Sequence, residues 1–123
     1  MEAKNKTVMI IDDDARNIFA LNAVLKSRGY RCISAQGAAE AIELLEGNIP
    51  TDIVLIDMMM PGMDGYEAIP VIKGLENRQG VPVIAVTAQA MVGDREKCLR
   101  AGADGYVSKP IDVDKLMQQL AVL

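Results

Sequence analysis

Unbroken runs of apolar residues occur at three places in the chain, and each is long enough for a short β-strand. The runs cover residues 8–11, 53–56 and 81–86. Strands without alternating polar positions are typical of a parallel sheet that is buried on both faces. Two shorter and more polar stretches, 31–35 and 105–107, are predicted to form strands at the edges of the same sheet.

Between these strands, apolar residues recur three and four positions apart, which is the spacing of amphipathic helices. The positions that mark the first, second and last helices are Ile18, Leu21 and Leu25; Ala38, Ala41, Ile42 and Leu45; and Val113, Leu116, Met117 and Leu120. The third helix is expected over 66–75 and the fourth over 94–101. Gly29 and Gly102 are expected to end the first and fourth helices. Pro70 falls inside the third helix, so an irregular or kinked start is expected there.

The strict alternation of strands and helices predicts parallel strands joined by right-handed crossovers, with helices on both faces of the sheet. The short, polar second and fifth strands belong at its edges. This arrangement corresponds to an α/β fold of the flavodoxin-like, doubly wound type, (βα)5, with a five-stranded parallel sheet in the order 2-1-3-4-5. No repeat or linker divides the sequence, so one domain is expected over residues 1–123.

The composition limits where this domain acts and what it binds. The formal net charge is −4, and Lys and Arg are interleaved with acids, as in residues 94–97, which argues against nucleic-acid binding. No apolar run approaches the roughly 20 residues that span a bilayer, and residues 1–4 lack a signal-peptide pattern. We therefore expect a cytoplasmic domain without membrane contact. Cys32 and Cys98 have no metal-ligand spacing and are expected to be reduced and partly buried.

The chain contains no histidine. This excludes Ser-His-Asp and Cys-His catalysis, histidine-ligated zinc and a role as a phosphohistidine carrier. Any chemistry must therefore be carried by carboxylates, lysine, hydroxyl groups and hard cations.

Polar side chains follow the predicted strands at their carboxyl ends, where ligands bind in open parallel sheets. Three consecutive carboxylates, at residues 12–14, follow the first strand, and Asp57 follows the third. Thr87 follows the fourth strand, and residues 108–110 (Ser-Lys-Pro) follow the fifth. With the strand order predicted above, all these groups meet at one rim of the sheet.

The acidic cluster has a structural and a functional interpretation. Asp14 is expected to cap the first helix, because Asp is a favoured N-cap residue. Capping does not explain Asp12 and Asp13, and adjacent carboxylates repel one another unless a cation compensates their charge. Together with Asp57 they offer hard oxygen ligands, which suit Mg²⁺. A neighbouring cation would also keep Asp57 ionised, so that it can act as a nucleophile.

Thr87 and Lys109 add a hydroxyl and an ammonium group to the same rim. These are the donors that a phosphoryl anion needs. Each of the three residues is common in its own position. Thr often ends strands, Lys often precedes Pro, and an Asp after a strand is often a turn or capping residue. Their combination with Asp57 predicts a site for phosphoryl chemistry.

Five segments of the chain carry motifs of a known family in order and spacing. They are residues 10–14, 55–65, 86–88, 101–106 and 109–110. On these segments the chain resembles a response regulator receiver domain of two-component signalling along its whole length. Residues 12–17 and 91–98 are most similar to the receivers of hybrid sensor histidine kinases.

The resemblance implies that Asp57 is the phosphoacceptor. It also implies that Mg²⁺, for which Mn²⁺ could substitute, is bound directly by Asp13 and Asp57. Asp12 would assist through water, and the backbone carbonyl of Met59 would supply a further ligand.

For the phosphoryl group, the resemblance implies that Thr87 and Lys109 hold its oxygens and that Ala88 leaves space for them. Lys109 and Pro110 would be joined by a cis peptide bond, which proline tolerates. Tyr106 occupies the aromatic switch position. Phosphorylation would draw Thr87 inward and let Tyr106 rotate into the vacated space.

The implied partner is a sensor histidine kinase or a histidine phosphotransfer protein, whose phosphohistidine would supply the phosphoryl group in a phosphorelay. A downstream effector would bind the face formed by the fourth helix, fifth strand and fifth helix. The chain would be a signalling phosphoacceptor that catalyses its own phosphorylation and dephosphorylation, not an enzyme with a separate substrate. In a hybrid protein it would form part of a histidine kinase.

Two other classes share parts of the pattern. A phosphatase of the haloacid-dehalogenase type has an Asp-x-Asp pair after its first strand, which Asp12 and Asp14 match in spacing. However, Arg16 stands where that motif has Thr or Val, and Asp57 gains no comparable role. A flavodoxin-like electron carrier holds a flavin phosphate with hydroxyls and amides in its first loop, and the carboxylates here would repel that phosphate.

Overall fold

The structure is a computed structural model that describes residues 6–87 and 93–123. Its strands form one parallel sheet in the order β2-β1-β3-β4-β5. The strands are β1 (Thr7–Ile11), β2 (Arg31–Ala35), β3 (Ile53–Asp57), β4 (Val83–Thr87) and β5 (Gly105–Ser108). The predicted flavodoxin-like α/β fold and its strand order are therefore confirmed.

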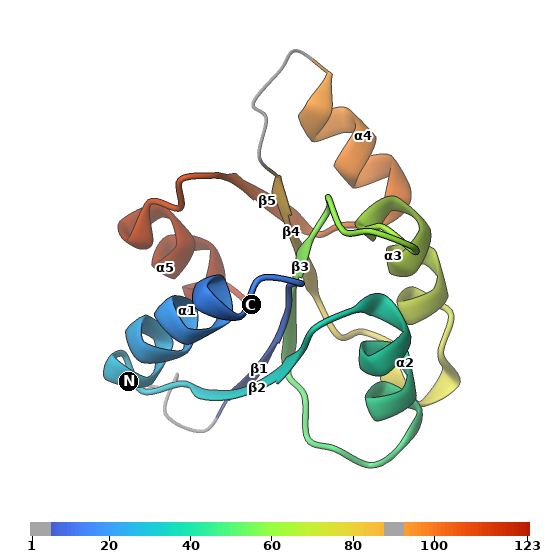
Figure 1. Ribbon diagram of the computed structural model, residues 1–123, viewed down its shortest axis with the longest axis horizontal. Helices are drawn as coiled ribbons and strands as arrows, with labels where there is room; N and C mark the ends of the chain where they lie inside the picture. The colour runs from blue at the N-terminus through green and yellow to red at the C-terminus, as the bar shows by residue number, and fades with distance from the viewer. Residues whose placement is uncertain (1–5, 88–92) are drawn as a thin grey trace.

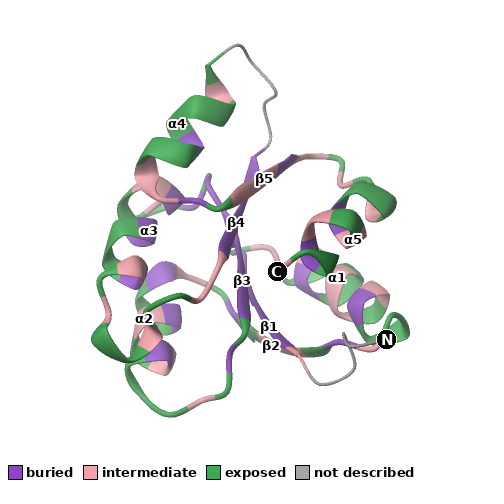
Figure 2. Cartoon of the chain, turned by 180° about the vertical axis from the view of Figure 1, so that it is seen from behind, coloured by how far each residue is buried: buried purple, intermediate pink, exposed green. Residues whose placement is uncertain are grey.

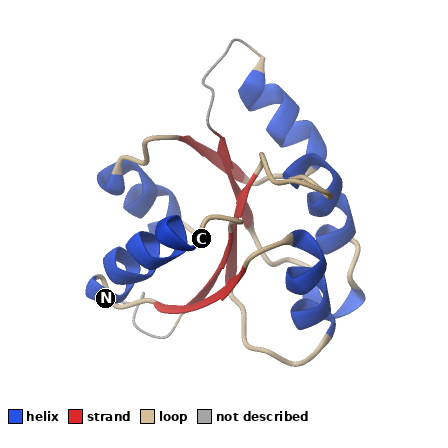
Figure 3. Cartoon of the chain, in the orientation of Figure 1, coloured by secondary structure: helices blue, strands red, loops and turns tan. Residues whose placement is uncertain are grey.

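Two layers of helices enclose the sheet (Figures 1 and 3). Helices α1 (Ala15–Ser27) and α5 (Val113–Ala121) cover one face, and α2 (Ala38–Glu46), α3 (Gly65–Lys73) and α4 (Asp94–Ala101) cover the other. The two faces are built from alternate residues of each strand, because successive side chains of a strand point to opposite sides. In β1, Met9 and Ile11 pack on the α2–α3–α4 side, whereas Val8 and Ile10 pack on the α1–α5 side.

The central strands are buried and the edge strands are partly exposed, as Figure 2 shows. All residues of β1, β3 and β4 are buried, whereas β2 and β5 are mostly half-buried or exposed. Burial on both faces explains why the central strands have unbroken apolar sequences. Both cysteines are free thiols; Cys32 is half-buried and Cys98 is buried, as expected from the sequence.

Several element boundaries differ from the prediction. Strand β4 begins at Val83 instead of residue 81, because Pro82 has no N–H group to donate to the sheet. Its carbonyl still accepts a hydrogen bond from Val54 N at 2.9 Å. Helix α3 ends at Lys73, before Gly74, and a short 3₁₀ helix (Glu76–Arg78) follows.

The start of α3 also differs from the expectation based on Pro70. Helix α3 continues without interruption through Pro70, which is exposed to solvent. The start of α3 is regular, with a complete capping box in which Asp64 accepts from Glu67 N and Glu67 accepts from Asp64 N. No helix in the described part of the chain is long and apolar enough to cross a membrane.

Candidate functional site

The register of the sheet brings the candidate residues to one edge. Ile11 of β1 lies beside Ile56 of β3, so Asp12 and Asp57 each follow a paired residue. Asp57 in turn lies beside Val86 of β4, which places Thr87 one residue further along its strand. Thr87 lies beside Ser108 of β5, and Lys109 comes next. The carboxyl ends of four neighbouring strands thus supply the site.

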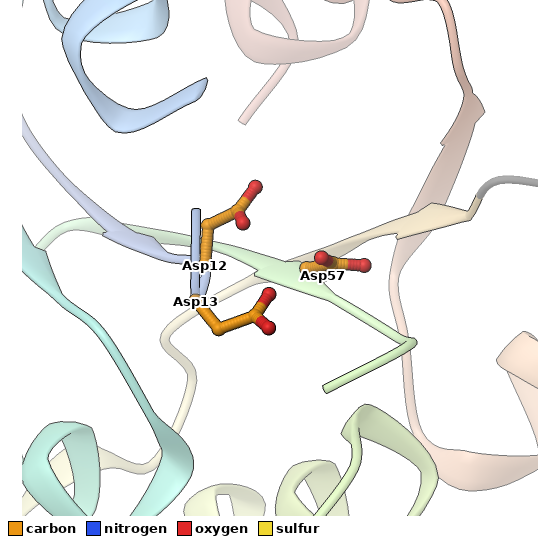
Figure 4. A group of neighbouring side chains, drawn as sticks. All are labelled: Asp12, Asp13 and Asp57. Atoms are coloured by element: carbon orange, nitrogen blue, oxygen red, sulfur yellow. The ribbon is translucent and has the colours of Figure 1, made fainter. Parts of the chain in front are cut away.

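Asp12, Asp13 and Asp57 form a compact group of carboxylates (Figure 4). Each offers one oxygen, and these oxygens lie within 4.8 Å of one another. Asp12 and Asp57 are buried, at 3% and 4% exposure, whereas Asp13 is exposed. Three hard oxygen donors at this spacing, open to solvent on one side, fit a divalent cation of the Mg²⁺ type.

The surroundings of Asp12 disfavour its charge. Burial raises the pKa of the Asp12 carboxyl above its usual range, and the nearby Asp57 charge adds to this effect. Hydrogen bonds oppose the shift, from Asp14 N to Asp12 Oδ1 at 2.9 Å and from Asn17 Nδ2 to Asp12 Oδ2 at 3.4 Å. The Lys109 ammonium also lowers this pKa. Positive charge at the site therefore favours the ionised form of Asp12.

Asp57 is held on both of its oxygens. Lys109 Nζ lies 3.4 Å from Asp57 Oδ2, and Met59 N donates to Asp57 Oδ1 at 3.0 Å. Lys109 Nζ also lies 4.0 Å from Asp12 Oδ2. One ammonium group therefore connects the two buried carboxylates and neutralises part of their charge.

Asp14 lies outside this group of carboxylates and caps α1, as predicted. Its Oδ1 accepts a hydrogen bond from Arg16 N at 2.9 Å. The Arg16 hydrogen bonds lower the pKa of the Asp14 carboxyl. The three consecutive acids thus divide into a capping residue and two that face Asp57.

Thr87 is buried at the end of β4, and its hydroxyl donates to Asp94 Oδ2 at 3.1 Å. Asp94 is the first residue of α4. The Thr87 carbonyl accepts from Lys109 N at 2.7 Å, which ties the ends of β4 and β5 together. The peptide bond between Lys109 and Pro110 is cis.

Two further site residues expected from the sequence are Tyr106 and Met59. Tyr106 is half-buried in β5 and packs against the core on the α2–α3–α4 side of the sheet. It lines a surface groove together with Arg95, Leu99 and Gln119. Met59 is 60% exposed, and its contact with Asp57 is made by its N–H group. The Ala88 position lies outside the described residues.

Two residues at the site had no role in the sequence prediction. Asn17 reaches Asp12 from the first turn of α1, and Asp94 reaches Thr87 from the first turn of α4. Both are polar residues in the first turn of a helix that follows a strand, which places them near the rim of the sheet. That signal identifies candidates but does not show which strand-end residue each one contacts.

Comparison with known proteins bears on this geometry. The family model described as "Response regulator receiver domain" matches residues 8–121. The signal transduction histidine-protein kinase BarA of Escherichia coli K12 is 39% identical over 110 residues, which are 89% of this chain and 12% of the kinase. The polar-differentiation response regulator DivK of Brucella abortus (strain S19) is 35% identical over 115 residues, 94% of this chain and 93% of DivK. The chain therefore matches a small part of one relative and nearly all of the other.

Solved structures agree with these matches. The receiver domain of the sensor histidine kinase PA1611 from Pseudomonas aeruginosa PAO1 has a TM-score of 0.85 and 35% identity, with 95% of each chain covered. That structure has a magnesium ion coordinated in its active site cleft. The Vibrio cholerae chemotaxis protein CheY4 shares the fold, with a TM-score of 0.87, 21% identity and coverage of 95% of this chain and 97% of CheY4.

Proposed function

This chain is a member of the response regulator receiver domain family of two-component signalling, and on that premise we propose that Asp57 accepts a phosphoryl group from a phosphohistidine. The observation that carries the proposal is the environment of Asp57. Asp57 is a buried carboxylate at the carboxyl end of a central strand, beside two further carboxylates and the Lys109 ammonium. A buried nucleophile with a compensating cation is suited to receive an anionic group.

Asp13 and Asp57 would hold Mg²⁺, or Mn²⁺ in its place, with Asp12 assisting through water, and the backbone carbonyl of Met59 would complete the protein ligands. When bound, the cation supplies positive charge against the phosphoryl oxygens. The oxygen spacing within 4.8 Å supports this role. Burial and repulsion, which disfavour the charge on Asp12, would be compensated at the same time.

In the transfer step, an oxygen of Asp57 attacks the phosphorus in line with the bond to the histidine nitrogen. The O–P bond forms while the P–N bond breaks, and the histidine nitrogen keeps the electron pair. The Lys109 ammonium, whose Nζ already lies 3.4 Å from Asp57 Oδ2, would bind one oxygen of the new phosphoryl group. The Thr87 hydroxyl would donate a hydrogen bond to another. Ala88, with its small side chain, would leave space for them. Positioning and charge neutralisation supply most of what phosphoryl transfer requires.

The same groups would catalyse hydrolysis of the acyl phosphate, so the domain would control both its own phosphorylation and its dephosphorylation. Both reactions would take place on the domain's own Asp57. The donor would be a sensor histidine kinase or a histidine phosphotransfer protein. The domain would act in the cytoplasm as the single domain spanning residues 1–123. It would work as a stand-alone regulator or as the receiver domain of a hybrid kinase.

The output would be a change of surface at α4, β5 and α5. When Thr87 turns toward the phosphoryl group, Tyr106 would rotate inward and the groove that it lines with Arg95, Leu99 and Gln119 would change shape. A downstream effector would bind there. Phosphorylation would in this way bias a two-state equilibrium.

The test is the intact mass of the protein after incubation with acetyl phosphate and Mg²⁺. The wild type should gain one phosphoryl group, and Asp57→Asn, or the wild type with EDTA, should gain none. Asp14→Asn is the matched control, because it removes a neighbouring carboxylate that caps α1 without joining the cluster. A gain that survives Asp57→Asn would overturn the proposal and make Asp12 the next candidate, which separate replacement of Asp12 would resolve.

A further inference from the structure

The hydroxyl of Thr87 is engaged by a carboxylate that belongs to another element. Thr87 Oγ1 donates to Asp94 Oδ2 at 3.1 Å, which connects the end of β4 to the first residue of α4. Thr87 is 3% exposed, and Asp94 is half-buried. A hydrogen bond to a charged acceptor is stronger than one between neutral groups.

This contact conflicts with the role proposed for Thr87. A hydroxyl has one proton to donate, and an ionised carboxylate and a phosphoryl oxygen are both pure acceptors. The proton can therefore serve Asp94 or the phosphoryl group, and not both at once. The free energy of the Thr87–Asp94 hydrogen bond opposes the rearrangement that phosphorylation requires.

We infer that Asp94 is a positioning residue that competes with the phosphoryl group for the Thr87 hydroxyl and so sets the balance between the two states. In the unphosphorylated protein, Asp94 holds Thr87 toward α4. In the phosphorylated protein, the hydroxyl turns to the phosphoryl group, and the link between β4 and the first turn of α4 is released. The inference rests on the proposed function of Asp57 and Thr87.

The helix itself offers a matched comparison for the charge. Glu96 also lies in the first turn of α4 and is exposed to solvent. Removal of either acid changes the net charge equally and weakens the interaction with the helix dipole to a similar degree. Of these two acids, only Asp94 accepts the hydrogen bond from Thr87. A difference between the two variants therefore reports on the interactions of Asp94, which include those with Thr87, Tyr66 and Cys98. A Thr87→Ala background isolates the hydrogen bond.

The experiment measures the affinity of the full chain for beryllofluoride, a stable mimic of the phosphoryl group, by ¹H–¹⁵N NMR titration at constant Mg²⁺. Asp94→Ala should bind it about five- to tenfold more tightly than the wild type, because one competing charge-assisted hydrogen bond is lost. Asp94→Asn keeps an uncharged acceptor and should fall between the two. Glu96→Ala should stay within about twofold of the wild type, as expected for an exposed charge.

The decisive comparison is a double-mutant cycle with Thr87→Ala. Without the hydroxyl there is nothing to compete for, so adding Asp94→Ala should change the affinity by less than about twofold. The same NMR spectra show that each variant is folded. Equal tightening in both backgrounds, or no tightening by Asp94→Ala alone, would overturn the inference. Failure of the wild type to bind beryllofluoride would instead refute the proposed function.

Discussion

The side chain of Gln119 in α5 makes two hydrogen bonds with the backbone of Tyr106 in β5. Tyr106 N donates to Gln119 Oε1 at 3.1 Å, and Gln119 Nε2 donates to the Tyr106 carbonyl at 2.9 Å. An amide side chain thus occupies the positions that a further strand would take on this edge of the sheet. Edge strands with free backbone groups are templates for association, and covering them is a common protection. The contact also fixes the backbone of the proposed switch residue to α5.

We expect Gln119→Ala to lower the free energy of unfolding by about 1–3 kcal/mol, since it removes two hydrogen bonds. It should also increase self-association through the uncovered edge of β5. Urea denaturation and size-exclusion chromatography measure the two effects. Gln118→Ala is the matched control, because Gln118 is the adjacent glutamine and is exposed. Equal effects of the two substitutions would show that the contact with Tyr106 has no energetic importance.

The loop after Asp57 depends on a glycine at residue 65. Gly65 N donates to the Met58 carbonyl at 3.2 Å. A Cβ atom at Gly65 would lie 2.3 Å from Met58 Sδ and 2.8 Å from Met58 Cα. The sulfur could move, but the backbone carbon could not, so Gly65→Ala must displace the residue that follows Asp57.

We therefore expect Gly65→Ala to cost about 2–3 kcal/mol, as overpacking of a buried position does, and to slow phosphorylation by acetyl phosphate. Gly37→Ala is the control, because a Cβ there meets nothing within 4 Å. Gly37 is the N-cap of α2, where Ala is less favourable than Gly by less than about 1 kcal/mol. Thermal melts and the intact-mass assay compare the variants. Normal phosphorylation of Gly65→Ala would show that the loop adapts without disturbing Asp57.

The fold and the acidic cluster were predictable because each depends on local pattern and topology. The apolar runs identify β1, β3 and β4 as central strands, and a parallel sheet places Asp12, Asp13 and Asp57 at one edge. The cap formed by Asp14 follows from its position before a helix. These features require only that neighbouring strands end together.

Other contacts depend on side-chain positions that no periodicity encodes. The Thr87–Asp94 hydrogen bond depends on where α4 begins relative to the end of β4. The Gln119–Tyr106 pair depends on the height of α5 along the sheet. The sequence shows that these residues are polar and near the rim or the edge strand, and the packing of the helices decides which of them meet.

The carboxylate cluster predicts that the fold is stabilised by Mg²⁺. With Mg²⁺ at ten times its dissociation constant, one bound ion adds about 1.4 kcal/mol to the free energy of unfolding, which a thermal melt detects as a rise in the melting temperature. Asp13→Asn should lose most of this gain, because Asp13 contributes one of the three clustered oxygens. Asp14→Asn should keep it, because Asn caps helices as well as Asp. Equal Mg²⁺ responses from both variants would place the ion elsewhere.

Tyr66 in α3 should make the fold sensitive to alkaline pH. Burial raises the pKa of the Tyr66 hydroxyl to about 12, and the neighbouring Cys98 and Asp94 add to the effect. Lys97 Nζ lies 4.8 Å from the centre of the Tyr66 ring, so this residue links α3 to α4. Between its ordinary pKa of 10.0 and about 12, Tyr66 is protonated in the folded chain and ionised in the unfolded chain.

The folded state therefore binds more protons than the unfolded state in that range, and its stability must fall as the pH rises from about 10 to about 12. The contribution of Tyr66 is fully present below pH 10.0 and is lost above about 12. Tyr66→Phe removes the ionisable group, so its free energy of unfolding should decline less steeply with pH over this range. Urea denaturation at several pH values measures both slopes, with each protein referred to its own stability at pH 7. Because lysines and the other tyrosines titrate in both proteins, their contributions cancel in the difference. Identical slopes would mean that Tyr66 ionises as easily in the folded chain as in the unfolded one, and that the contact between α3 and α4 leaves its hydroxyl open to water.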